Sequence, residues 1–108
     1  MTPVSIAIAE AEERDVVVFV TGEIDFATAP LLEGTLRWYL DRDVIVDLSA
    51  VTLFDASGLT ALIRTRKRLR QSGHTLRTTG ERGAVLAAMT VTGLLDTFRG
   101  IADDSGGS

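Results

Sequence analysis

The residue with the clearest chemical potential in this sequence is Ser57, within the run Phe-Asp-Ala-Ser-Gly-Leu at positions 54–59. Asp55 is a good N-cap for a helix, and a serine in the first helical turn holds its hydroxyl near free backbone N–H groups and solvent. Such a hydroxyl can be a nucleophile, a phosphate acceptor or a protein contact, or simply an ordinary helix residue. Gly58 favours a functional role, because glycine costs a helix about 1 kcal/mol relative to alanine but lets another backbone approach closely.

Several kinds of catalytic site are excluded around this serine. The single histidine, His74, follows Ser57 by 17 residues and lies just past the far end of the same predicted helix, roughly 25 Å away. Neither a Gly-x-Ser-x-Gly elbow nor a Gly-x-x-x-x-Gly-Lys phosphate loop occurs. One histidine, no cysteine and scattered carboxylates predict no metal site, and we expect no cofactor.

A second candidate residue, Asp25, follows the second predicted strand in the loop Gly22–Asp25. If that strand and the next one run parallel, their carboxyl ends place Asp25 and Ser57 at the same edge of the sheet, where binding sites of α/β proteins usually lie. The alternative is that Asp25 only flanks a helix.

Hydrophobic periodicity predicts the elements that would position these residues. Strands are expected at residues 4–9, 15–21, 44–48 and 74–79, the first two as a hairpin. Helices are expected after an N-cap at Thr28, from Asp55 to a left-handed cap at Gly73, and around 85–89, with an apolar patch at 91–98. In the second helix, the expected core residues are Leu59, Leu62, Ile63 and Leu69. Alternating strands and helices predict an α/β domain with a mixed four- to five-stranded sheet and three or four helices.

Composition is ordinary for a soluble globular protein, with 45% hydrophobic and 24% charged residues. No apolar run approaches the roughly 18 residues of a membrane span. Five basic residues, Arg64, Arg66, Lys67, Arg68 and Arg70, crowd one segment. We interpret them as a solvated helix face, with an acidic partner or DNA as alternatives. The formal net charge of −4 disfavours DNA.

Three segments together resemble one family. Residues 44–63, VIVDLSAVTLFDASGLTALI, resemble the phospho-acceptor segment of STAS domains, specifically of bacterial anti-sigma factor antagonists. Gly22–Asp25 and Thr92–Phe98 match two weaker motifs of that family, so that the resemblance covers about residues 4–99. It implies a single STAS-like domain, which we place at residues 1–101, followed by a tail at 102–108 that we expect to be disordered.

The resemblance also implies site residues. In the family, a partner anti-sigma factor, which is a serine kinase, phosphorylates the serine directly before the glycine, and that position is Ser57 here. The family most often has Asp-Ser-Ser-Gly or Asp-Ser-Thr-Gly, and Ala56 departs from that pattern. The resemblance implies that Asp25 helps to contact the kinase. We expect the remaining partner-binding residues to be Asp55, Ala56, Ser57 and Gly58.

By this resemblance, the chain is expected to bind an anti-sigma serine kinase, release a sigma factor and be switched off when Ser57 is phosphorylated, until a phosphatase resets it. We expect a cytoplasmic protein, monomeric or weakly dimeric, which is not itself an enzyme and contacts neither nucleic acid nor membrane. The alternative is a non-switching STAS interaction module of a lipid ABC transporter or of a signalling scaffold, in which Ser57 is only a contact.

Overall fold

The computed structural model describes residues 4–10 and 15–100. Residues 11–14, which connect the strands of the expected hairpin, and the tail expected at 102–108 lie outside these residues. The elements, in chain order, are β1 (Ser5–Glu10), β2 (Asp15–Ile24), α1 (Ala29–Leu36), the 3-10 turn η1 (Arg37–Tyr39), β3 (Asp43–Phe54), α2 (Ala56–Gln71), β4 (Leu76–Thr79), α3 (Gly83–Val91) and α4 (Leu95–Arg99).

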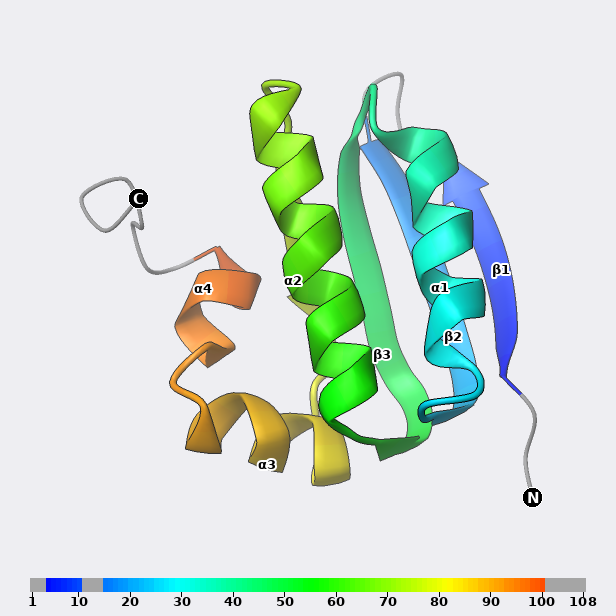
Figure 1. Cartoon of the computed structure of the whole chain (residues 1–108), viewed down its shortest axis with the longest axis vertical. Helices are drawn as coiled ribbons and strands as arrows, with labels where there is room; N and C mark the ends of the chain where they lie inside the picture. The colour runs from blue at the N-terminus through cyan, green and yellow to red at the C-terminus, as the bar shows by residue number, and fades with distance from the viewer. Residues whose placement is uncertain (1–3, 11–14, 101–108) are drawn as a thin grey trace.

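The sheet is mixed and its strand order follows the chain, β1-β2-β3-β4. β1 and β2 form the expected antiparallel hairpin, while β2 with β3 and β3 with β4 are parallel. Helices α1 and α2 lie side by side over one face of the sheet, α3 packs against β3, and α4 packs against β4 (Figure 1). The α/β class, the hairpin and the four strands are therefore confirmed.

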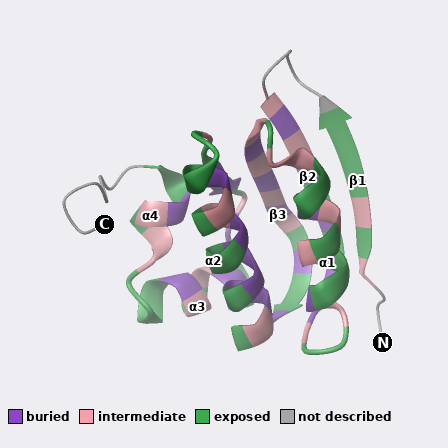
Figure 2. Cartoon of the chain, turned by 45° about the horizontal axis from the view of Figure 1, so that its top comes forward, coloured by how far each residue is buried: buried purple, intermediate pink, exposed green. Residues whose placement is uncertain are grey.

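The core lies between the sheet and α1 and α2. Alternate residues of the two central strands point into it and are fully or almost fully buried: Val16, Val18 and Val20 of β2, and Val44, Val46 and Leu48 of β3. Figure 2 shows the resulting banding of buried and exposed positions along these strands. This period of two is the pattern of a strand that buries one face.

Both central strands are longer than predicted. β2 continues through Gly22 to Ile24, and β3 continues six residues past Leu48, to Phe54. The parallel pairing supplies backbone partners for both extensions, but with two register shifts, one of them beside Gly22, whose φ of 101° suits glycine. Buried and exposed positions still alternate through Ile24 in β2, but the alternation is lost after Leu48 in β3, so that the β3 extension does not show the period of a strand in the sequence.

One predicted core residue of α2 was wrong. Leu59, Leu62 and Leu69 are buried, but Ile63 is 43% exposed because it lies beside the buried stripe of the helix. Thr65 is buried in its place, with its hydroxyl donating to the Ala61 carbonyl at 2.8 Å. The end of α2 is as predicted, since Gly73 follows it with a φ of 83°.

Glu81, just after β4, ties α4 to the sheet. Its side chain is 2% exposed and accepts hydrogen bonds from the Thr78 hydroxyl and from Nε of Arg99, the latter at 2.9 Å. Burial alone would raise the pKa of Glu81, but the bonds from Thr78 and Arg99 outweigh burial and hold the pKa below its ordinary value of 4.5.

Glu81→Gln is therefore expected to lower the free energy of unfolding by roughly 1–3 kcal/mol at neutral pH, because Arg99 loses an ionised partner. A folded-state pKa below the unfolded one means that the carboxylate stabilises the fold above about pH 4.5, and that this contribution is lost as the pH falls through the folded pKa. Urea unfolding of both proteins between neutral pH and about pH 3 tests this prediction. Equal differences between the two proteins at every pH would contradict it.

Candidate functional site

The carboxyl ends of β2 and β3 bring the two predicted loops together. Ile24 pairs with Phe54 at the end of the parallel ladder, and the N–H of Asp55 donates to the Ile24 carbonyl at 3.2 Å. Asp25 and Asp55 therefore leave the sheet at adjacent points, at the lower edge in Figure 1, where α1 and α2 both begin. The parallel arrangement on which the predicted proximity of Asp25 and Ser57 depended is confirmed.

Asp55 is the N-cap of α2, as predicted. Its carboxylate accepts the N–H group of Ser57 at 2.8 Å, one of the N–H groups that a helix start leaves without a helical partner. It also accepts the Gly58 N–H at 3.4 Å, which donates in addition to the Asp55 carbonyl at 3.1 Å. Phe54 before the cap and Leu59 after it are both buried, as expected for a hydrophobic staple. The Asp55 cap and the packing of Phe54 with Leu59 thus hold the first turn of α2, and this turn fixes the direction in which the Ser57 side chain points.

The Ser57 side chain is partly exposed to solvent. Within residues 4–10 and 15–100, no hydrogen bond engages its hydroxyl, and no buried side-chain oxygen or nitrogen lacks a partner. Because the Ser57 hydroxyl has no partner among these residues, it is not one of the buried groups and is accessible to solvent. The residue as a whole is partly exposed. It lies at a pocket of about 330 Å³ between the starts of α1 and α2, whose lining also includes Phe26, Ala29, Pro30, Glu33, Ala56, Thr60 and Arg64.

Asp25 is held in place by its own loop. Its carboxylate accepts the N–H groups of Ala27 at 2.9 Å and Thr28 at 3.0 Å. Thr28 returns the interaction, because its hydroxyl accepts the Asp25 N–H at 2.9 Å and donates to the Glu23 carbonyl at 2.8 Å. The hydrogen bond from the Thr28 backbone lowers the pKa of Asp25, so that a carboxylate is kept charged at this edge.

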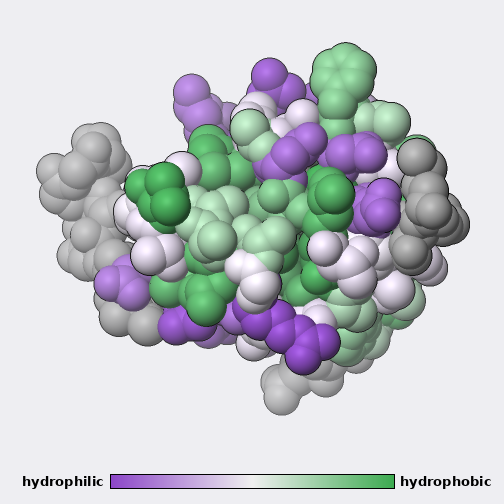
Figure 3. Space-filling view, turned by 90° about the horizontal axis from the view of Figure 1, so that it is seen from below, coloured by the Kyte–Doolittle hydropathy of each residue, from purple (hydrophilic) through white to green (hydrophobic). Residues whose placement is uncertain are grey.

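Thr28 stands at the N-cap position of α1, as predicted, but its hydroxyl does not cap the helix; it braces the preceding loop. Apolar side chains next to this loop remain at the surface. Phe26 is 83% exposed and Leu53 is 41% exposed, whereas Phe54 is buried. Figure 3 views this end of the molecule from below and shows hydrophobic residues spread across the middle of the face. Exposed apolar area beside a charged rim is characteristic of protein-binding surfaces.

The model of the STAS domain family matches residues 7–106. The chain belongs to the STAS domain family. It is 34% identical over 96 residues to the anti-sigma-B factor antagonist of Listeria monocytogenes, an alignment that covers 86% of this chain and 84% of that protein. A crystal structure of an anti-sigma factor antagonist from Mycobacterium paratuberculosis is 32% identical and superposes with a TM-score of 0.72, covering 88% of this chain and 82% of the other.

A further structural neighbour shares the fold at low sequence identity. The anti-sigma factor antagonist SpoIIAA in its unphosphorylated form superposes with a TM-score of 0.71 at 16% identity, covering 92% of this chain and all of that one. The fold predicted for a STAS domain, with its N-terminal hairpin and mixed sheet, is therefore shown by the architecture as well as by the sequence.

The structure of this STAS domain gives a different reason for glycine at position 58 from the one that we inferred from the sequence. It is buried, and a Cβ added to it would lie 2.7 Å from a ring carbon of Phe54 and 2.8 Å from Cγ2 of Ile24. The missing side chain thus makes room for the protein's own core under the first turn of α2. The interpretation that this space admits the backbone of another molecule is wrong.

Six of the eight residues that line the pocket were not among the predicted site residues, and three of these six, Glu33, Thr60 and Arg64, have polar side chains. Thr60 and Arg64 follow Ser57 at i+3 and i+7 on the same side of α2, and Glu33 of α1 faces them across the pocket. Arg64 Nη1 lies 3.6 Å from Glu33 Oε1, which links the two helices. The helical spacing of Ser57, Thr60 and Arg64 is the signal that could have identified them.

Two further findings concern residues 4–10 and 15–100 of the STAS domain. No helix there has the length and apolar character needed to span a membrane. Nor do three or more side chains of the metal-ligating types gather into a potential metal site in that part of the chain.

Asp55→Ala is expected to lower the free energy of unfolding by about 1 kcal/mol, because the Ser57 N–H loses its acceptor and the Gly58 N–H loses one of its two acceptors. Asp55→Ser should keep most of that stability, since serine caps helices nearly as well as aspartate does. Chemical denaturation of the three proteins measures the effect. Equal stability of Asp55→Ala and the wild type would show that the cap is dispensable.

Proposed function

We propose that this chain is an anti-sigma factor antagonist that acts in the cytoplasm by binding an anti-sigma serine kinase, and that the kinase switches it off by phosphorylating Ser57. The observation that carries this proposal is the open Ser57 hydroxyl on the capped first turn of α2, at the position where STAS antagonists are expected to accept a phosphate. The antagonists among the relatives support the general role.

The surroundings of Ser57 suit a kinase-binding surface. The Asp25 carboxylate, the exposed Phe26 and Leu53 side chains and the pocket between α1 and α2 lie around the same edge. Apolar side chains at the centre and a charged group at the rim are the usual composition of a protein interface. In this proposal the chain is the ligand and the substrate, and the ATP belongs to the kinase.

A phosphate on Ser57 would change the interface more than the fold. It adds about −1.5 to −2 charges at neutral pH, and the start of a helix favours negative charge by about 0.3–1 kcal/mol. The Asp55 carboxylate already accepts the Ser57 N–H, so that phosphorylation brings two negative groups together at this edge. Burying that charge under a bound kinase without a matching cation costs several kcal/mol, whereas leaving it in solvent costs little.

The test is to incubate the full chain with candidate anti-sigma kinases and ATP and to locate the added phosphate by mass spectrometry. We expect the phosphate on Ser57 and none on Ser57→Ala. Thr60→Val is the matched control, because Thr60 is a neighbouring hydroxyl residue in the same pocket and its loss should leave labelling intact. Phosphate only on residues other than Ser57 would reject the site, and kinase binding without any labelling would favour the non-switching module.

A further inference from the structure

The outer edge of β1 is open among the described residues. β1 stands at the end of the strand order and pairs on its inner side with β2, and no described strand lies beyond it (Figure 1). The pairing with β2 runs in continuous register from Ser5 to Glu10, without a bulge. A regular edge strand presents a row of backbone N–H and C=O groups that lack strand partners, and this row is a template for a further strand.

The sequence of β1 lacks the features that protect most edge strands. Natural proteins protect such edges with lysine and other charged side chains, proline, bulges, short strands or a covering helix. Residues 5–9, SIAIA, contain neither a charged residue nor a proline, and β1 is six residues long. Ser5, Ala7, Ile8 and Ala9 are exposed, so that no described element covers them.

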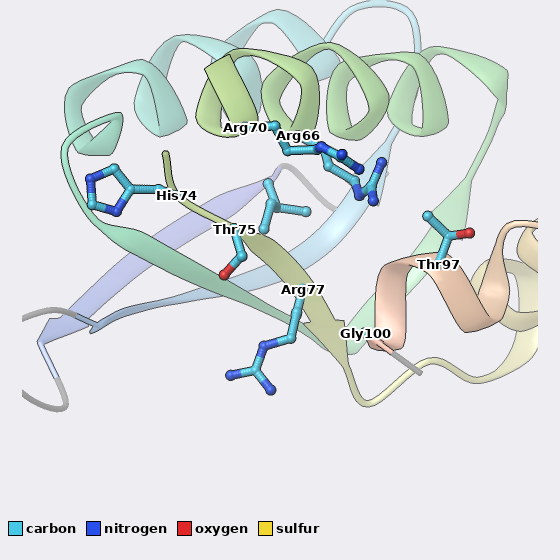
Figure 4. Close-up of a pocket in the computed structure, with 8 residues that line it drawn as sticks. Arg66, Arg70, His74, Thr75, Arg77, Thr97 and Gly100 are labelled. Atoms are coloured by element: carbon cyan, nitrogen blue, oxygen red, sulfur yellow. The ribbon is translucent and has the colours of Figure 1, made fainter. Parts of the chain in front are cut away.

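The opposite edge of the sheet is protected. β4 has only four residues, and α4 packs against it. Figure 4 shows this edge beside a pocket of about 480 Å³ that Arg66 and Arg70 line at the far end of α2. Gly100, at the end of α4, lies so close to β4 that an added Cβ would be 2.7 Å from Arg77 Cδ. One open edge and one protected edge allow two copies of the chain to join, but not a longer series of copies.

The β1 strand is complementary to itself. If two copies pair in antiparallel orientation about a two-fold axis at Ala7, Ala7 lies opposite Ala7 of the other copy and Ile6 lies opposite Ile8. Isoleucines then meet on one face of the joined sheet and small residues on the other. Glu10, the one charged residue of β1, lies opposite Val4 rather than its own copy, so that like charges do not face each other. A contact between identical surfaces requires this kind of match.

An exposed apolar flank of α1 and η1 borders the same edge. Trp38 is 83% exposed and Leu31 is 59% exposed. Glu33 faces α2 through its ion pair with Arg64, and at about 100° per residue Leu31 and Trp38 lie on roughly the opposite side of the helix from Glu33. Figures 1 and 2 show α2 on one side of α1 and the β1 edge on the other. Two copies joined along β1 would therefore turn these flanks towards each other over one face of the joined sheet.

We propose that two copies of this chain associate through their β1 edges, in antiparallel register about Ala7, with Leu31 and Trp38 of both copies lying over the joint. The uncharged edge lets two copies, each with a net charge of −4, meet without placing like charges in contact. One strand and two side chains per copy make a contact smaller than the standard interface of about 800 Å² per partner, so that the dimer is weak and reversible. The proposal does not depend on the proposed function, because none of these residues lines the pocket at Ser57.

The experiment measures the mass of the full chain by sedimentation equilibrium from about 5 to about 500 μM, a range that brackets weak homodimers. We expect a reversible equilibrium between monomer and dimer, without larger species. Trp38 is the single tryptophan of the chain, so that its fluorescence reports directly on this surface. Its emission should move to shorter wavelength as the dimer forms, because the indole ring loses contact with water.

Ala7→Lys tests the position of the axis, because it places two lysines opposite each other. It should weaken association about tenfold or more, which corresponds to at least about 1.4 kcal/mol. Thr79→Lys is the matched control, since Thr79 is exposed in the same row of the sheet but on β4, and it adds the same charge. That variant should change the association constant less than about threefold. Circular dichroism checks folding, and Ala9→Lys replaces Ala7→Lys if the latter fails to fold.

Three results would overturn the proposal. The first is a chain that stays monomeric over the whole concentration range; if its Trp38 emission then shifts only when an anti-sigma kinase is added, the surface belongs to the kinase. The second is an equal association constant for Ala7→Lys and Thr79→Lys, which would place the contact elsewhere. The third is a dimer that forms without any change in Trp38 emission.

Discussion

Ser57→Asp is expected to weaken binding of the cognate anti-sigma kinase about hundredfold or more, which corresponds to at least about 2.7 kcal/mol. The reason is that the new carboxylate adds charge beside Asp55 and must lose its water when the kinase covers the pocket between α1 and α2. Ser57→Ala should bind within about threefold of the wild type, because it removes a hydroxyl that no hydrogen bond within the described residues engages.

Affinity is measured by calorimetry with the purified kinase in the presence of nucleotide, and circular dichroism checks that each variant is folded. Gln71→Glu is the charge control, because it adds a negative charge to an exposed residue at the opposite end of α2. That variant should bind as the wild type does. Equal affinities of the wild type, Ser57→Ala and Ser57→Asp would reject the charge mechanism while leaving the antagonist role open.

The second large effect is expected at Gly58. Gly58→Val should lower the free energy of unfolding by roughly 3 kcal/mol, and Gly58→Ala by roughly 1–2 kcal/mol. Any Cβ there would overlap the Phe54 ring and the Ile24 methyl group, and both of these side chains are buried and cannot move freely. The gain in helix propensity of about 1 kcal/mol on replacing glycine by alanine offsets only part of that cost.

Gly34→Ala is the matched control for this series. Gly34 is a helical glycine of α1 with nothing within 4 Å of an added Cβ, so that this change should stabilise the protein by about 0.5–1 kcal/mol. Chemical denaturation gives the four free energies of unfolding on one scale. If Gly58→Ala proves as stable as the wild type, the packing explanation fails and a role for Gly58 at the binding surface becomes the better interpretation.

The two glycines also show what local rules can and cannot predict. Helix propensity treats Gly34 and Gly58 alike, because it depends only on the residue and its own helix. The structure separates them, since Gly58 is buried against the ends of β2 and β3 and Gly34 faces solvent. The space at Gly58 is filled by Phe54 and by Ile24, which is 34 residues earlier in the chain, and only the tertiary structure brings these two side chains under the first turn of α2.

The candidate functional site shows the same difference between features that local sequence predicts and features that depend on tertiary packing. The role of Asp55 as N-cap follows from local sequence, and the structure agrees with it. Glu33, Thr60 and Arg64 were missed, because α1 and α2 line one pocket only through the way in which they pack. The basic residues of α2 were interpreted as one solvated face, but Arg64 belongs to the pocket at Ser57, and Arg66 and Arg70 to the pocket at the far end.

The sequence by itself determined the α/β class, the hairpin, the helix that starts at Asp55 and ends before Gly73, and the family, because these depend on periodicity, capping residues and short motifs that act over a few positions. Only the tertiary structure decided how far β2 and β3 extend, why residue 58 has no side chain and which arginines share a pocket. Those features depend on backbone pairing across register shifts and on helices packing over a sheet, and both join residues that are distant in the chain.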